Sequence, residues 1–249
     1  GYATSISVLA LALIAPILGA IADYKGMKKR LFVASLTVGI LGGLTFTAVN
    51  QWQAFLILFI IARLGYSACN VFYDSMLVDV SSDERMDMIS SFGYAFGYIG
   101  STIPFIVGIV LILNAETIGI STVLATQISF LITFLWWALL SLPMLKNVNQ
   151  KFYLEPRPHI VSESFKRIFI TLKKIRANKR MLYYIIAYFC YIDGVYTIIS
   201  MATTYGGEVG IGQTQMILAL LLTQFVAFPF AILAGMLAKK FGAIKLIKV

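Results

Sequence analysis

The sequence predicts an all-α polytopic membrane protein, and three observations lead to that fold class. The first is composition: 59% of the 249 residues are hydrophobic and only 12% are charged, against about 45–50% and about 25% in an average soluble domain. The second is that the apolar residues stand in long blocks. The third is that lysine and arginine are confined to alternate connections between these blocks.

Each apolar block is near or above the length that crosses a bilayer as a helix, which is about 20 residues for ~30 Å of hydrocarbon. Most blocks are apolar all round rather than along one stripe, as expected for helices surrounded by lipid or by other helices. The seven blocks cover residues 3–22, 31–49, 54–74, 92–113, 119–142, 181–203 and 214–238.

The basic residues predict the orientation of these helices. All but one of the 20 lysine and arginine residues lie near residues 24–30, 80–91 and 143–180 or after residue 238, and the intervening connections hold none. Basic connections are cytoplasmic, so residue 1 is expected outside and residue 249 inside. The net charge of +9 is therefore a topology signal, and no basic face of a soluble domain indicates nucleic-acid binding.

The long connection, residues 143–180, separates five spans from the two that follow. Within it, apolar residues recur at helical spacing and basic residues fill the other side, which predicts an amphipathic helix at the headgroups of the anionic inner leaflet. An ordinary linker helix is the alternative. The apolar positions are Phe165, Ile168, Phe169, Leu172 and Ile175.

Three ionisable residues lie inside predicted spans, where charges are costly and mark functional sites. Arg63 lies roughly 14 Å deep and Asp193 roughly 18 Å deep, both near the midplane. The third, Asp74, lies with Ser67, Asn70 and Arg63 on one face of the third span; Tyr196 and Thr197 share the face of Asp193. These side chains either line a wet cavity or form a structural ion pair between helices.

The fourth span carries small residues on one helical face. Small residues at this spacing let two helix backbones approach closely, and glycine and proline also allow a helix to bend. Close packing and a bending, gating helix are the two interpretations. The residues are Gly93, Gly97, Gly100, Pro104 and Gly108.

The first basic connection carries a motif that resembles the signature of a known family. It reads Gly19-Ala-Ile-Ala-Asp23-Tyr-Lys-Gly26-Met-Lys28-Lys29-Arg30. This resembles the loop signature of the major facilitator superfamily, Gly-x-x-x-Asp-Arg-x-Gly-Arg-Arg, from which Tyr24 and Met27 depart. The resemblance implies a cytoplasmic gate whose Asp stabilises one access state through a helix outside this chain.

Further stretches resemble a narrower family. Arg63-Leu-Gly-Tyr resembles the fourth-helix arginine motif of the superfamily, which makes the seven spans helices two to eight of twelve. Four stretches resemble the vacuole-effluxer-like family, whose yeast member exports amino acids from the vacuole. They are Asn70-Val-Phe-Tyr-Asp-Ser-Met-Leu, Ser91-Phe-Gly-Tyr-Ala-Phe-Gly-Tyr-Ile-Gly, Tyr191-Ile-Asp-Gly-Val-Tyr-Thr-Ile and Thr223-Gln-Phe-Val-Ala-Phe-Pro-Phe.

The resemblance implies a partial major-facilitator helix bundle. Residues 1–142 are then five helices of the N-terminal half, residues 143–180 the cytoplasmic joint with its amphipathic helix, and residues 181–249 the first part of the C-terminal half, with two helices and the start of a third. Helix one and helices nine to twelve are not among the spans of this chain.

The function implied is secondary transport of a small solute by alternating access, in a bacterial inner membrane, with amino-acid efflux as one candidate. Arg63 would attract a carboxylate, and Asp193 would hold an ammonium group or carry a coupling proton. A channel or lipid scramblase is the alternative. A magnesium-dependent membrane prenyltransferase is disfavoured, because Asp74 and Asp79 point about 140° apart on a continuous helix. No metal or cofactor motif is present.

Overall fold

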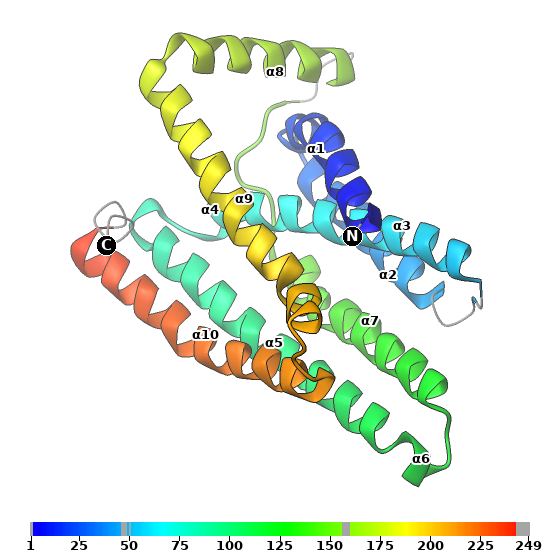
Figure 1. The fold of residues 1–249 in the computed structure, drawn as a ribbon. Helices are drawn as coiled ribbons and strands as arrows, with labels where there is room; N and C mark the ends of the chain where they lie inside the picture. Colours follow the sequence, from blue (N-terminus) through cyan, green and yellow to red (C-terminus); the bar gives the residue numbers. More distant parts are fainter. Residues whose placement is uncertain (1, 46–48, 50, 156–159, 243–249) are drawn as a thin grey trace.

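The structure is a computed structural model that describes residues 2–45, 49, 51–155 and 160–242. Every regular element among these residues is a helix (Figure 1), which confirms the all-α fold class. The helices are α1 (Tyr2–Ala22), α2 (Met27–Leu44), α3 (Trp52–Ser75), α4 (Leu77–Val80), η2 (Asp83–Arg85), α5 (Met86–Leu113), α6 (Ala115–Ile118), α7 (Thr122–Asn147), α8 (Ile160–Ala177), α9 (Lys179–Glu208) and α10 (Gln213–Phe241).

Six of the described helical stretches are long and apolar enough to cross a membrane: α1, α3 with α4, η2 with α5, α7, α9 and α10. The chain is therefore a multi-pass membrane protein. The remaining expected span, residues 31–49, corresponds to α2, which is 18 residues long and begins at Met27. Lys28, Lys29 and Arg30 occupy its first turn, and its apolar part follows them and ends with the helix at Leu44. Residues 46–48 of that block lie outside the described residues.

Two helix ends differ from the predicted connection of residues 143–180. Helix α7 continues through Pro143 to Asn147, and α9 already begins at Lys179. A proline costs a helix the backbone hydrogen bond to the carbonyl four residues earlier, a loss that membrane helices tolerate. At the end of α7 the Asn147 side chain donates to the Pro143 carbonyl, one of the last carbonyls of the helix, at 2.8 Å. The Asn178 side chain caps α9 by accepting from the Met181 amide at 3.2 Å.

The N-terminal helices pack through glycines that the sequence reading does not single out. A Cβ at Gly65 on α3 would collide with the backbone of Gly39 on α2, and a Cβ at Gly42 would lie 3.1 Å from the Ala62 backbone. Backbones that approach this closely need small residues at the crossing. Helix α3 is thereby fixed against α2, with α1 on its other side.

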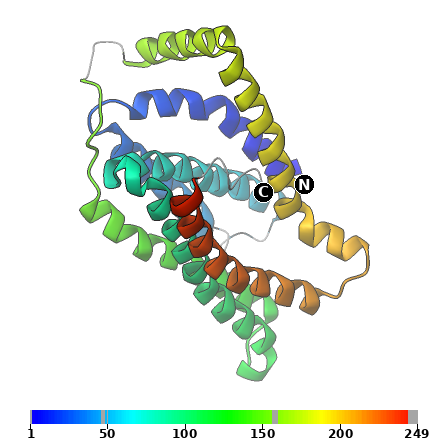
Figure 2. The ribbon, with the colours of Figure 1, turned by 90° about the vertical axis from the view of Figure 1, so that its left-hand side faces the viewer.

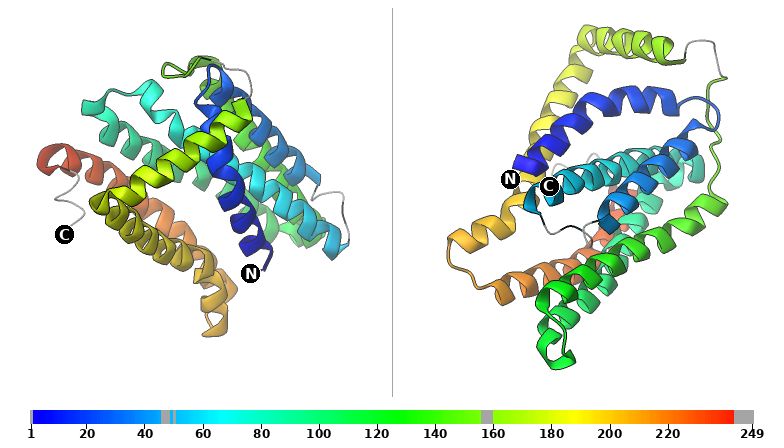
Figure 3. Two further views of the ribbon diagram at one scale, coloured as in Figure 1. Left: turned by 90° about the horizontal axis from the view of Figure 1, so that it is seen from above. Right: turned by 90° about the vertical axis from the view of Figure 1, so that its right-hand side faces the viewer.

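Helices α5, α7 and α10 form the other group, in which α5 packs against both neighbours. Helix α9 runs at the side of the bundle and meets other helices mainly at its two ends, where it packs on α8 and α10 (Figures 2 and 3). Helix α8 lies along α1 at the top of Figure 1. The middle of α9 is exposed within the described part of the chain.

The buried core lies in the cytoplasmic halves of α1, α2 and α3, by the predicted orientation. Its members are Ala22, Phe32, Leu36, Ala68, Cys69, Phe72 and Met76. These side chains lie next to the connection that carries the motif of residues 19–30, which we call the gate motif. The core therefore holds in place the helix ends from which the groups described next project.

Candidate functional site

A buried ion pair stands where α2 begins and α3 ends. The Lys28 ammonium lies 2.8 Å from Asp79 Oδ2 and also donates to the Ser75 carbonyl at 2.9 Å. Lys28 is 5% exposed and Asp79 is 1% exposed. Breaking a buried pair by removing one partner leaves a costly unpaired charge, so this pair ties the first connection firmly to α4.

The same carboxylate holds the segment after α7. Asp79 Oδ1 accepts the backbone N–H groups of Lys151 at 2.8 Å and Phe152 at 3.1 Å. One oxygen of Asp79 thus binds the gate motif, and the other binds residues 148–155, which we call the strap. Sequence reasoning treats Asp79 as a residue of the cytoplasmic loop and misses this role, because its partners are 51 and 72 residues away.

The strap also pairs directly with the first connection. The Leu154 N–H donates to the Asp23 carbonyl at 2.8 Å, and the Lys25 N–H donates to the Leu154 carbonyl at 3.0 Å. Tyr24, between them, forms an isolated parallel bridge with Leu154 and is only 2% exposed. Tyr24 stands where the superfamily signature has arginine, and a buried position of this kind suits an uncharged ring.

Two further side chains complete what we call the clamp, which consists of the strap, the gate motif and Asp79. The Lys29 ammonium donates to the Val148 carbonyl at 3.2 Å, and the Gln150 amide donates to the Ala22 carbonyl at 3.0 Å. The bonds join segments more than a hundred residues apart in sequence. The clamp therefore joins the ends of α1, α2, α3 and α7 at the basic connections into one connected unit.

Asp23 of the gate motif bonds to α8. Its Oδ2 lies 2.8 Å from Arg167 Nη2, and the two side chains are 48% and 39% exposed. The sequence argument expects the partner on a helix outside this chain, whereas the structure supplies one within it. Of the other motif residues, Gly26 has φ 72°, a left-handed conformation that favours glycine. Gly19 has no neighbour within 4 Å of an added Cβ, and Arg30 is exposed.

The midplane residues are arranged differently. On α3, Arg63 and Ser67 are half-buried and Asn70 and Asp74 are exposed. The Arg63 Nε is buried and has no hydrogen-bond partner. On α9, the side chains of Asp193, Tyr196 and Thr197 are exposed. We call these seven residues the midplane stripe.

The charges of the midplane stripe do not pair with one another. The ion pairs among the described residues are Lys25–Glu155, Lys28–Asp79 and Arg167–Asp23, so none joins Arg63 to Asp193 or to Asp74.

The small residues of α5 have different surroundings. Gly108 meets Ser129 of α7, whose Oγ would lie 3.3 Å from an added Cβ, and the Gly100 carbonyl accepts from Trp136 Nε1 at 2.9 Å. Pro104 is buried. A Cβ at Gly93 would meet only the Tyr73 hydroxyl, at 3.5 Å, and one at Gly97 would meet nothing within 4 Å.

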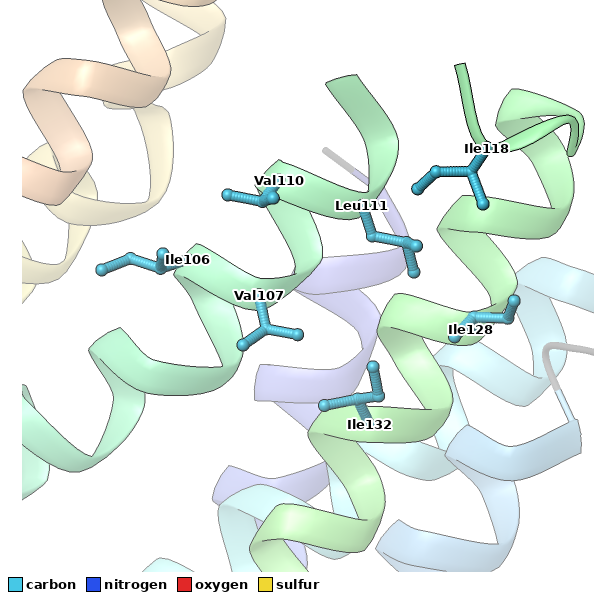
Figure 4. A pocket seen from close by; sticks show the side chains of 7 residues that line it. All are labelled: Ile106, Val107, Val110, Leu111, Ile118, Ile128 and Ile132. Carbon is cyan, nitrogen blue, oxygen red and sulfur yellow. The ribbon is translucent and has the colours of Figure 1, made fainter. Parts of the chain in front are cut away.

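An apolar pocket of about 410 Å³ lies between α5 and α7 (Figure 4). Hydrocarbon side chains alone line it, and a solute site normally adds a few polar groups that fix the ligand's orientation. This pocket is therefore a poor candidate for a polar solute. Its lining is Ile106, Val107, Val110, Leu111, Ile118, Ile128 and Ile132.

Comparison with known proteins identifies the family. The model of the family described as vacuole effluxer Atg22 like matches residues 1–84 and 78–247. The chain belongs to this Atg22-like family. It is also 46% identical over 245 residues to a Bacillus subtilis (strain 168) protein named uncharacterized MFS-type transporter YxiO.

The match covers 97% of this chain but 57% of the Bacillus protein, so the chain spans little more than half the length of that relative. No solved structure matches the chain. The family resemblance inferred from the four stretches and from the gate motif is confirmed by the family model and by the Bacillus relative.

Proposed function

We propose that the protein to which these Atg22-like helices belong is a secondary transporter that moves a small solute by alternating access. The observation that carries this proposal is the midplane stripe, whose charges have no ion-pair partner among the described residues. Unpaired charges inside a membrane span are expensive unless they face a water-filled cavity. A cavity that exposes them to a solute accounts for their presence.

The two midplane charges suit a zwitterion. Arg63, whose Nε is buried and unbonded, attracts an anionic group such as a carboxylate. Asp193 on α9 holds an ammonium group or carries a coupling proton. An amino acid carries both charges, and the family description as an effluxer favours export. The Bacillus relative favours a bacterial cell membrane as the location.

The clamp suits a gate on the cytoplasmic side of this cavity. Its bonds hold the ends of α1, α2, α3 and α7 together at the basic connections, so these four helices move as one body. Asp79 is fully engaged by Lys28 and the strap. It is therefore not free to share a magnesium ion with Asp74, which argues against a prenyltransferase.

Flux through the full-length protein in proteoliposomes tests the proposal. We expect uptake of labelled leucine and of other amino acids to saturate with concentration and to show counterflow when the unlabelled compound is preloaded. A pH gradient should drive accumulation if Asp193 carries the coupling proton. Flux that rises linearly with concentration and shows no counterflow would instead mark a channel or a lipid scramblase.

A further inference from the structure

Helix α8 has one face that is packed and another that is open. Ser164 is fully buried and Arg167 is bonded to Asp23 at the end of α1, so this face is turned toward α1. Large apolar side chains lie about 60–140° around the helix from Ser164, at about 100° per residue, and are between 52% and 72% exposed. We call them the α8 apolar face, which consists of Val161, Phe165, Phe169 and Leu172.

The structure divides the apolar residues that the sequence pattern groups together. Ile168 and Ile175 are half-buried and lie about 20–40° around the helix from Ser164, on the side of α1. Phe165 and Phe169 remain on the open side. Helix α8 therefore packs on protein with part of its apolar surface and keeps another part exposed within the described part of the chain.

Basic residues border the α8 apolar face. Five residues of α8 are basic and one, Glu163, is acidic. Lys173 lies about 180° from Ser164, next to the apolar face, and Arg176 lies at about 120°, one turn beyond Leu172. Both basic side chains are exposed, and neither has an ion-pair partner among the described residues. An apolar face bordered by cations is typical of helices that lie in an anionic headgroup region.

Two anchors place α8 at the level of the span ends. Arg167 ties its middle to Asp23, which directly follows the last residue of α1. Its last residue is Ala177, and the span α9 already begins at Lys179. The chain bends sharply between α8 and α9 in Figures 1 and 2, so α8 does not lengthen that span. Helix α8 therefore lies where the headgroups are, and the bilayer is the apolar phase within its reach.

We propose that the α8 apolar face docks on anionic lipids of the adjoining leaflet, which is the cytoplasmic one by the predicted orientation. Its hydrocarbon side chains enter the boundary between headgroups and acyl chains, and Lys173 and Arg176 meet the lipid phosphates. A long basic side chain at such a place extends its charged end toward the headgroups. The anionic headgroups supply the counter-charge that the described residues do not. This docking does not depend on which solute the protein moves.

Hydrogen exchange of the full-length protein in lipid nanodiscs tests the docking. One set of nanodiscs contains phosphatidylcholine alone, and the other contains equal parts of phosphatidylcholine and phosphatidylglycerol. The amides of Ile160–Ala177 should exchange at least about tenfold more slowly in the anionic set, because each basic residue near an anionic leaflet strengthens binding about fivefold. The amides of residues 83–90 are the internal reference and should exchange equally in both sets.

Charge variants assign the effect to the basic border of α8. Lys173→Glu with Arg176→Glu should remove the difference between the two sets of nanodiscs, because acidic side chains are repelled by the anionic leaflet. Arg85→Glu with Lys146→Glu is the matched control, since it makes the same change of net charge at exposed positions outside α8. The control should keep the slow exchange of α8 in anionic nanodiscs.

Apolar variants assign the effect to the apolar face independently. Phe165→Ser with Phe169→Ser should lose the slow exchange, because the hydrocarbon that enters the leaflet is gone. Ile170→Ser is the matched control, since Ile170 is exposed and lies about 100–140° around the helix from the two phenylalanines. It should exchange as wild type does. All substituted side chains are exposed, so melting temperatures in detergent should match that of wild type.

The outcomes distinguish the lipid from other occupants of the α8 apolar face. Fast exchange of α8 in both sets of nanodiscs would mean that nothing docks there and would overturn the proposal. Equally slow exchange in both sets, lost in the phenylalanine variant, would mean that the rest of the full-length protein covers the face and would overturn it as well. Slow exchange only in anionic nanodiscs, lost in both test variants and kept in both controls, would support it.

Discussion

The clamp and the midplane stripe use similar residues in opposite ways. In the clamp, Lys28 and Asp79 are almost fully buried and every charged oxygen of Asp79 has a hydrogen-bond donor. In the stripe, Arg63 and Asp193 have no ion-pair partner within the part of the chain that the structure describes. A satisfied buried charge fixes the positions of the segments that supply its partners, whereas an unsatisfied charge in a membrane helix remains available to a ligand.

The largest expected effect is on flux at the midplane stripe. Arg63→Gln and Asp193→Asn should each abolish transport by the full-length protein in proteoliposomes while lowering the detergent melting temperature little, because a wet cavity can solvate a neutral amide. Glu208→Gln, at the end of α9, is the control and should transport normally. Large stability losses in both single variants, with stability and flux restored in the double variant, would show a structural ion pair instead.

Substitutions in the clamp should instead cause a large loss of stability. Asp79→Ala leaves the Lys28 ammonium buried without its partner, which costs about 3–5 kcal/mol, and thermal unfolding of the full-length protein measures it. Lys28→Met combined with Asp79→Leu should recover most of that loss. The amides of Lys151 and Phe152 nevertheless lose their acceptor in the double variant, so hydrogen exchange at these two amides should be faster than in wild type. Equal stability of Asp79→Ala and wild type would contradict the clamp.

The two regions also differ in how well the sequence predicts them. Arg63, Asp74 and Asp193 are recognisable because a charge stands out inside an apolar block, and their depth follows from the helical rise. Asp79 does not stand out, since acidic residues are ordinary at the end of a span, and its partners lie far away in sequence. The same holds for Tyr24, whose burial depends on pairing with Leu154.

The fold itself is more predictable than the clamp. Six blocks are confirmed as long apolar helices, because block length alone sets the number of spans. The start of α2 at Met27 and the end of α7 at Asn147 depend on how charges and prolines are accommodated at the membrane surface, which periodicity does not show. The crossing of Gly39 and Gly65 likewise requires knowing which two helices meet.

A smaller loss of stability is expected at the crossing of α2 and α3. Gly65→Ala places a Cβ against the Gly39 backbone, and overpacking of this kind costs about 1–3 kcal/mol. Gly97→Ala on α5 meets nothing within 4 Å and should be neutral or slightly stabilising, because alanine favours a helix over glycine. Melting temperatures of the two variants measure the difference. If Gly97→Ala were the less stable of the two variants, Gly39 and Gly65 would not form the tight helix crossing.

The smallest stability effect is expected at Asp23 and Arg167, which test whether the clamp extends to α8. Both side chains are partly exposed, and pairs of that kind contribute about 0–1 kcal/mol. Asp23→Asn should therefore leave the amount of folded protein almost unchanged. The initial transport rate should change more, because this bond joins the gate motif to the helix between the two halves and so favours one access state.

Arg167→Gln decides which partner Asp23 uses during transport. If α8 supplies the partner, Arg167→Gln should change the initial rate in the same direction and by a similar factor as Asp23→Asn, and the exchanged pair Asp23→Arg with Arg167→Asp should restore part of the rate. Lys166→Gln, a neighbouring exposed position on α8, is the matched control and should transport as wild type does. A rate that depends on Asp23 but not on Arg167 would mean that the gate motif works through a different helix, as the superfamily resemblance implies, and that the clamp ends at the strap.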